Sequence, residues 1–297
     1  MMPLPATIAP EHLDELRKAR ARLEHPGFPV KLASMVGAPV EKLLARLPGV
    51  AGNLVNDATR AALDKCLALA LRTIRKPPGT AGDAAWGNPT TPTTGSGARP
   101  GVPAPHGEAL ERTSSRFHKL AVAATGAAGG AFGFVSLPVE LPVTTTLMFR
   151  SIGEIAQAYG EDLTSPDAQL QCLMVLAMGG PAKAEDDAAY GYFVVRGAMA
   201  QTVAAATAEL AGKSAASHGS AFVTKMVHSV AARFSAQVGE QAAAKAIPVV
   251  GAVFGAAINT VFISHFQEMA RGHFAIRRLE RLYGEETVRL AYERVGG

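Results

Sequence analysis

Two side chains that could carry acid–base chemistry, Glu140 and His265, lie among apolar residues. Glu140 lies in the run Leu-Pro-Val-Glu-Leu-Pro. A carboxylate in such surroundings is costly unless it is paired. It also directly precedes a helix that we expect to begin at Pro142, and the dipole of that helix favours an anion. We therefore predict a cap or a buried ion pair at Glu140, with a functional acid as the alternative.

The last long helical segment carries His265, Glu268 and His273 on neighbouring turns. His265 and Glu268 are three residues apart, which resembles half of a metal site. The spacing departs from the His-Glu-x-x-His pattern of zinc proteases. His273 falls on an apolar stripe and is predicted to be a hydrogen-bonded core histidine. We predict no metal site and no cofactor.

Residues 144–146 are three threonines in a segment of helical spacing, although β-branched residues lower helix propensity. Thr146, Arg150 and Glu154 are four residues apart and share one face. This spacing predicts an ion pair between Arg150 and Glu154.

Several arginines flank the apolar stripe near the C-terminus, with Glu280 close enough to pair with Arg277. We expect them to form a solvated face, with lipid head groups or an acidic partner as the alternative ligand. These arginines are Arg271, Arg277, Arg278 and Arg281.

Other signatures of catalysis are incomplete. Cys66 and Cys172 lie among apolar residues and are predicted to be free, structural thiols. Gly212-Lys213-Ser214 resembles the end of a P-loop, but Thr207 stands where the first glycine is needed. The chain has no Gly-x-Ser-x-Gly elbow and no paired Cys-x-x-Cys.

The composition is that of a folded and slightly hydrophobic chain. Of 297 residues, 48% are hydrophobic and 18% are charged, which excludes disorder over the whole length. The net charge of +4 is too small for an obvious nucleic-acid binder. Residues 1–76 hold twelve Lys/Arg against seven Asp/Glu, so the basic excess is N-terminal. We see no signal peptide and expect a cytoplasmic protein.

Helical periodicity predicts an all-α multi-helix bundle with three parts. Residues 1–76 form N-terminal helices that pack on the core, residues 77–107 form a disordered Pro/Gly/Thr-rich linker, and residues 108–297 form the main helical domain. The expected helices span residues 10–23, 39–47, 53–74, 108–125, 142–159, 166–178, 184–212, 219–245 and 248–283.

Two uncharged, glycine-rich segments interrupt this pattern, at residues 120–139 and 246–264. They carry GxxxG spacing, which lets helices approach closely. Each is about as long as a membrane-crossing helix. A tightly packed soluble core, a reversible membrane-inserting element and a permanent span all remain open. The GxxxG pairs are Gly126–Gly130, Gly129–Gly133 and Gly251–Gly255.

The runs at residues 129–180 and 247–284 resemble the EcsC protein family, and residues 53–76 resemble the segment that usually precedes them. The linker resembles an insertion outside the family core. The family is named after a neighbour of an ABC-transporter operon, and its members are mostly uncharacterised. The resemblance places these residues in family motifs: Glu140, Thr144, Thr145, Arg150, Glu161, Asp162, Asn259, His265 and Arg278.

From these motifs we take Glu140 and His265 as candidate catalytic residues. Candidate binding residues are Thr144, Thr145, Arg150, Asn259 and Arg278. The leading hypothesis is a non-enzymatic helical protein, peripheral to or partly inserted into the inner face of the cytoplasmic membrane, with lipids as its partners. The alternative is a soluble, hydrolase-like enzyme with a site centred on Glu140 and His265. A third hypothesis is an adaptor that recruits a protein partner through residues 77–107.

Overall fold

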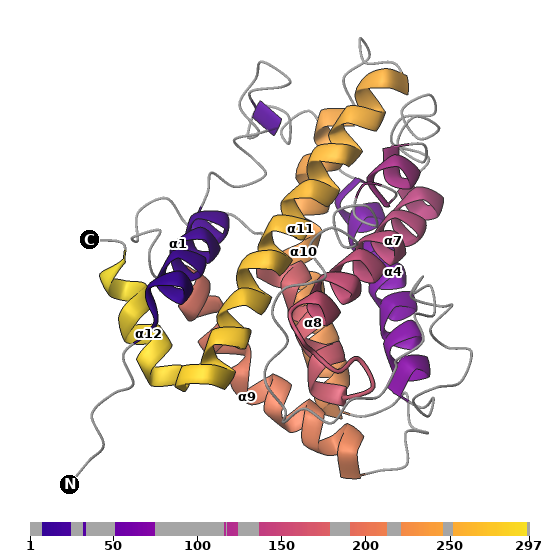
Figure 1. Cartoon of the computed structure of the whole chain (residues 1–297). Helices are drawn as coiled ribbons and strands as arrows, with labels where there is room; N and C mark the ends of the chain where they lie inside the picture. The colour runs from indigo at the N-terminus through magenta and orange to yellow at the C-terminus, as the bar shows by residue number, and fades with distance from the viewer. Residues whose placement is uncertain are drawn as a thin grey trace, which may run out of the picture.

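The computed structural model describes residues 8–24, 32–33, 51–74, 116, 118–123, 137–178, 191–212, 221–245 and 252–295. Every regular element among these residues is a helix, which confirms the predicted all-α bundle. Figure 1 shows their arrangement, with α1 and α12 on one side of the long helix α11 and α4 and α7 on the other. The helices are α1 (Pro10–Glu24), α4 (Ala51–Ile74), α7 (Leu137–Ala158), α8 (Pro166–Met178), α9 (Gly191–Gly212), α10 (Ala221–Lys245), α11 (Ala252–Tyr283) and α12 (Glu285–Arg294).

Helix α7 begins five residues earlier than the sequence predicts, at Leu137 instead of Pro142. Proline inside a helix removes a hydrogen bond and crowds the preceding turn. Here that turn carries Glu140 and Leu141, both buried, so tertiary contacts outweigh the local penalty. Glu140 therefore lies within the first turn of α7. The sequence analysis had placed it just before the helix.

The other predicted helices agree with the structure to within a few residues wherever the chain is described. The predicted helix at 39–47 and the linker at 77–107 lie outside the described residues. Of the predicted helix at 108–125, residues 116 and 118–123 are described, and they are helical.

Helix α12 is an element that the periodicity did not predict. Gly284 has φ +85°, a left-handed conformation that glycine adopts without strain, and it separates α11 from α12. Glu285 and Glu286 occupy the first turn of α12 and Arg294 the last, which suits the helix dipole.

The core forms around α8, which is buried at every position from Ala168 to Ala177. Figure 1 shows α8 in the interior of the bundle, next to α7, α10 and α11. A helix that is buried all round needs apolar residues on every face, and α8 has them. A second cluster of buried residues joins α1, α12, the end of α11 and Tyr192 of α9.

Helix α1 packs very closely on α11 at Gly272. A Cβ atom added there would lie 2.6 Å from Cγ of Leu23 and 3.0 Å from the carbonyl oxygen of Ala19. Only glycine allows the two helices to approach this far. The N-terminal helix is thus seated on the longest helix of the bundle.

Candidate functional site

The amide of Asn259 joins separate parts of the chain through a buried hydrogen-bond cluster. Its Nδ2 donates to Oε1 of Glu140 at 2.8 Å and to the carbonyl of Val122 at 3.2 Å. Its Oδ1 accepts from Nε2 of Gln241 at 2.6 Å. All three side chains are buried. We call Val122, Glu140, Gln241 and Asn259 the amide hub.

The amide hub supplies the buried partner that the sequence demanded for Glu140. This partner is the neutral amide of Asn259. The position of Glu140 in the first turn of α7 adds favourable interaction with the helix dipole. Because a hydrogen bond to a carboxylate is charge-assisted, the Glu140–Asn259 bond is stronger than an ordinary amide pair.

The amide hub also joins residues that lie in or near both glycine-rich segments. Val122 and Glu140 lie near the two ends of the segment at 120–139, Gln241 precedes the segment at 246–264, and Asn259 lies within it. Gly255 is buried in α11, while Gly126, Gly129, Gly130, Gly133 and Gly251 lie outside the described residues.

His265 is also buried on α11. It follows Asn259 by six residues, which places it about 9 Å along the helix and about 120° around it. The hydrogen bond to Glu140 comes from Asn259. The structure therefore gives no support to a hydrolase-like pair of Glu140 and His265.

The remaining motif residues on α7 face the core. Thr144 and Thr145 are buried, and the carbonyl of Thr145 accepts a contact from the Cys66 thiol at 3.7 Å. The hydroxyl of Thr145 and Nε of Arg150 are buried without a hydrogen-bond partner in the described part of the chain. Glu154 lies beside His118 at 3.6 Å, and its predicted pairing with Arg150 stays a prediction.

The C-terminal arginines lie in ion pairs that range from buried, at Arg278, through half-buried, at Arg277, to exposed, at Arg281. The predicted solvated face is therefore wrong for Arg278. Arg277 pairs with Glu161 at 2.9 Å and with Asp167 at 2.7 Å. Glu280, the partner predicted for Arg277, instead receives two hydrogen bonds from Arg196 at 2.6 and 2.7 Å. Helical spacing suggested a pair within one helix, but residues from other parts of the chain provide the partners.

Arg278, a candidate binding residue, is buried and donates to Glu15 of α1 at 2.6 Å. Arg281 also reaches Glu161, which therefore serves two arginines. Asp162 accepts from the backbone and hydroxyl of Thr164 in the turn before α8. The contacts of Arg278, Glu161 and Asp162 thus hold elements of this fold together.

His273 is the hydrogen-bonded core histidine that the sequence predicts. Its Nδ1 lies 2.9 Å from the hydroxyl of Tyr192 and its Nε2 lies 3.1 Å from Oε1 of Gln171. Burial, and secondly the charges of Arg196 and Arg277, lower the pKa of His273 well below its usual range. The imidazole is therefore neutral near pH 7.

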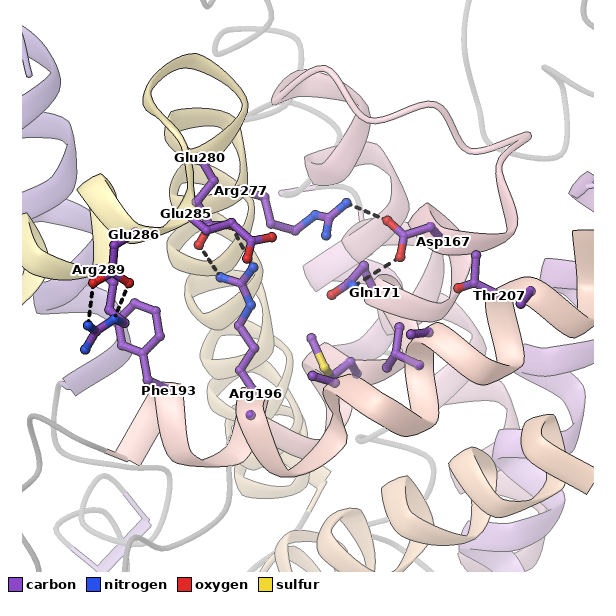
Figure 2. Close-up of a pocket in the computed structure, with 16 residues that line it drawn as sticks. Asp167, Gln171, Phe193, Arg196, Thr207, Arg277, Glu280, Glu285, Glu286 and Arg289 are labelled. Atoms are coloured by element: carbon purple, nitrogen blue, oxygen red, sulfur yellow. Dashed lines mark hydrogen bonds and ion pairs between the residues drawn. The ribbon is translucent and has the colours of Figure 1, made fainter. Parts of the chain in front are cut away.

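An open groove lies beside these ion pairs, between α8, α9, α12 and the end of α11, with a volume of about 760 Å³. Figure 2 shows Arg196 rising from α9 to Glu280 and Arg277 reaching across to Asp167. Small residues of α9 line the groove, and we call it the α9 groove. These residues are Gly197, Ala200, Ala204 and Ala208.

No group of three or more potential metal ligands occurs among the described residues. Burial raises the pKa of both cysteine thiols, so neither Cys66 nor Cys172 is primed as a nucleophile. Within the described ranges, no helix is both long and apolar enough to cross a bilayer.

The protein is an all-α helical bundle. Most of the residues that the sequence analysis placed in family motifs make contacts inside this bundle. The chain belongs to the EcsC protein family, whose sequence model matches residues 10–279. No match was found among the curated proteins or among the solved structures.

Sequence reasoning missed Gln241, Arg196 and the groove residues Gln171 and Thr207. Gln241 stands as an isolated polar residue in an alanine-rich run, and Arg196 is a lone charge in the first turns of an apolar helix. A buried polar group needs a partner, so both positions offered a signal, but the sequence does not identify the partner.

Proposed function

We propose that this EcsC-family protein is a non-enzymatic, membrane-associated helical protein that acts at the inner face of the cytoplasmic membrane. The glycine-rich segments at 120–139 and 246–264 would make the lipid contact. The amide hub carries the proposal, because its hydrogen bonds join residues in or next to both segments.

Exposed apolar side chains near the borders of the first segment support the same conclusion. Leu120 is 71% exposed, Val139 is 76% exposed and Val143 is 44% exposed. Val139 and Val143 are one helical turn apart on α7 and lie on the same face. Large exposed apolar residues that gather at one place favour contact with a partner or a lipid surface.

The basic excess of the N-terminal residues gives little support for attraction to anionic lipids. Helix α1 holds four basic and four acidic residues, so its net charge is zero. Arg20 pairs with Glu24, and Arg22 pairs with Glu268. We therefore expect apolar contact, more than attraction to anionic lipids, to dominate binding.

The test is flotation of the purified full-length chain with phosphatidylcholine vesicles, alone and with added phosphatidylglycerol. We expect the chain to float with both, with binding that survives a high-salt wash. A triple variant with Leu120→Ser, Val139→Ser and Val143→Ser should lose at least about half of the bound fraction, because three exposed apolar side chains no longer enter the lipid.

The matched control is Val194→Ser, which alters an exposed apolar residue on α9. It should float like the parent chain. If the parent chain stays with the soluble fraction in every lipid mixture, or the triple variant floats as the parent does, the proposed membrane role of these segments is wrong.

A further inference from the structure

The α9 groove has the properties of a binding site for a small amphipathic molecule. Its floor is a row of small residues on α9, and Met174 and Val203 add apolar surface. A Cβ atom added at Gly197 would meet nothing within 4 Å among the described residues. As far as the described residues show, the floor at Gly197 is therefore not packed against another helix, which leaves room there for an apolar chain.

Two arginines in the wall of the groove have hydrogen-bond donors that make no contact with the described protein. Arg277 uses Nε and Nη2 for Glu161 and Asp167, and its Nη1 has no partner among the described residues. Both terminal nitrogens of Arg196 donate hydrogen bonds, to Glu280 and to the hydroxyl of Tyr192. Its Nε has no partner among the described residues. Because both guanidinium groups line the groove, they can bind an acceptor such as a phosphate.

The lining also contains an acidic group without an internal ion pair. Glu285 is exposed, lines the groove and has no ion pair within the described part of the chain. It lies at the start of α12, next to Glu286, which pairs with Arg289. A cationic ligand group would find its counter-ion at Glu285.

The charges of the lining nearly cancel. Three arginines face four carboxylates, which gives a net charge of −1. A strongly anionic or strongly cationic ligand would meet as much repulsion as attraction, whereas a ligand with both charges fits both kinds of group. In addition, the hydroxyl of Thr207 lines the groove and has no hydrogen-bond partner in the described chain (Figure 2).

We propose that the α9 groove binds a single-chain amphiphile with a zwitterionic phosphate-and-ammonium head group, the chemistry of a lysophospholipid. The phosphate binds at Arg196 and Arg277, the ammonium binds at Glu285, and the chain lies along the small residues of α9. The inference concerns a different part of the molecule from the amide hub and does not require insertion into a bilayer.

The test is calorimetric titration of the full-length chain with dodecylphosphocholine below its micelle concentration. Dodecyl sulfate, dodecyltrimethylammonium and dodecyl maltoside carry the same chain with anionic, cationic and neutral heads. We expect dodecylphosphocholine to bind with the highest affinity, at one molecule per chain. If another of these heads binds as well or better, the zwitterionic assignment is wrong.

Gly197→Leu fills the floor of the groove and should weaken dodecylphosphocholine binding at least about tenfold, because several methylene groups lose their contact surface. The substitution also replaces a helical glycine with a better helix former, so the fold is expected to persist. Ala208→Leu provides a second filling variant further along the groove. Ala198→Leu, at an exposed α9 position outside the groove, is the matched control and should bind like the parent chain.

Glu285→Gln should weaken binding of dodecylphosphocholine about twofold to fivefold, as expected for one exposed ion pair, and should leave binding of dodecyl sulfate at least as strong. Free phosphocholine should bind far more weakly than dodecylphosphocholine. The proposal is overturned if Gly197→Leu and Ala208→Leu bind dodecylphosphocholine as tightly as the parent chain does. It is also overturned if free phosphocholine binds as tightly as dodecylphosphocholine. Failure to float with vesicles would overturn the membrane role but would leave these titrations unaffected.

Discussion

The two ends of α11 are held by different chemistry. Near its start, Asn259 makes hydrogen bonds through a neutral amide. Eighteen residues later, about 27 Å along the helix, Arg277 lies in a group of ion pairs. Figure 1 shows α11 running from one end of the bundle to its junction with α12.

The two ends of α11 should differ in how they respond to salt and to an apolar environment. Hydrogen bonds of a neutral amide are little affected by salt, whereas partly exposed ion pairs are screened by it. An amide cluster is also compatible with an apolar surrounding, where additional charges would be costly. The contrast therefore suits a molecule with one end near lipid and the other in water, as the proposed function requires.

The largest expected effect concerns the amide hub. Asn259→Leu removes three hydrogen bonds and deprives buried Glu140 and Gln241 of their shared partner. We expect the free energy of unfolding to fall by about 3–5 kcal/mol, because three buried hydrogen bonds are lost. Chemical denaturation followed by circular dichroism measures this loss.

The matched variant for this prediction is Glu140→Gln. It keeps an oxygen that accepts from Asn259 while it removes the buried charge, so its effect should be clearly smaller. Equal stability of the parent chain and Asn259→Leu would show that the amide hub does not hold the bundle together.

The ion-paired end should respond next most strongly. Arg196→Met leaves the buried carboxylate of Glu280 without its cation, and we expect a loss of about 2–4 kcal/mol in the free energy of unfolding. The double variant with Glu280→Met should recover most of this loss, because a well-packed apolar pair can replace a buried ion pair. If the double variant is as unstable as Arg196→Met, the ion pair is not the cause.

Much of the fold could be predicted from the sequence because local rules decide it. Apolar spacing predicted α4, and the run Ser165-Pro166-Asp167, typical of a helix start, predicted α8. The glycine at 160, with φ +81°, ends α7 as expected. Helix α12 was missed because ten residues with one short apolar face give a weak periodic signal.

The site could be predicted only as a set of residues. Sequence analysis selected Glu140 and Asn259 as candidates, with a site centred on Glu140 and His265 as its alternative hypothesis. It could not identify Gln241 as a partner, since hydrogen bonds between distant helices leave no periodic pattern. The same limit explains Arg277, whose predicted neighbour Glu280 binds Arg196 of another helix.

The smallest effect concerns protons at the ion-paired end. His273 is neutral in the folded chain because burial lowers its pKa, whereas in the unfolded chain its pKa is about 6.5. Below about pH 6.5 the unfolded chain therefore binds a proton that the folded chain does not. The stabilising contribution is complete above this pH and is lost as the pH falls, by up to about 1.4 kcal/mol per pH unit.

Urea denaturation at several pH values between about 7.5 and about 5.5 measures this slope. His273→Gln should remove the contribution of this residue, because an amide can bond to Tyr192 and Gln171 but does not titrate. Asn259→Leu should lower stability at every pH and keep the slope, since the amide hub is about 20 Å away along α11. A slope that persists unchanged in His273→Gln would mean that another group carries the pH dependence, and the contrast between the two ends would then not include protonation.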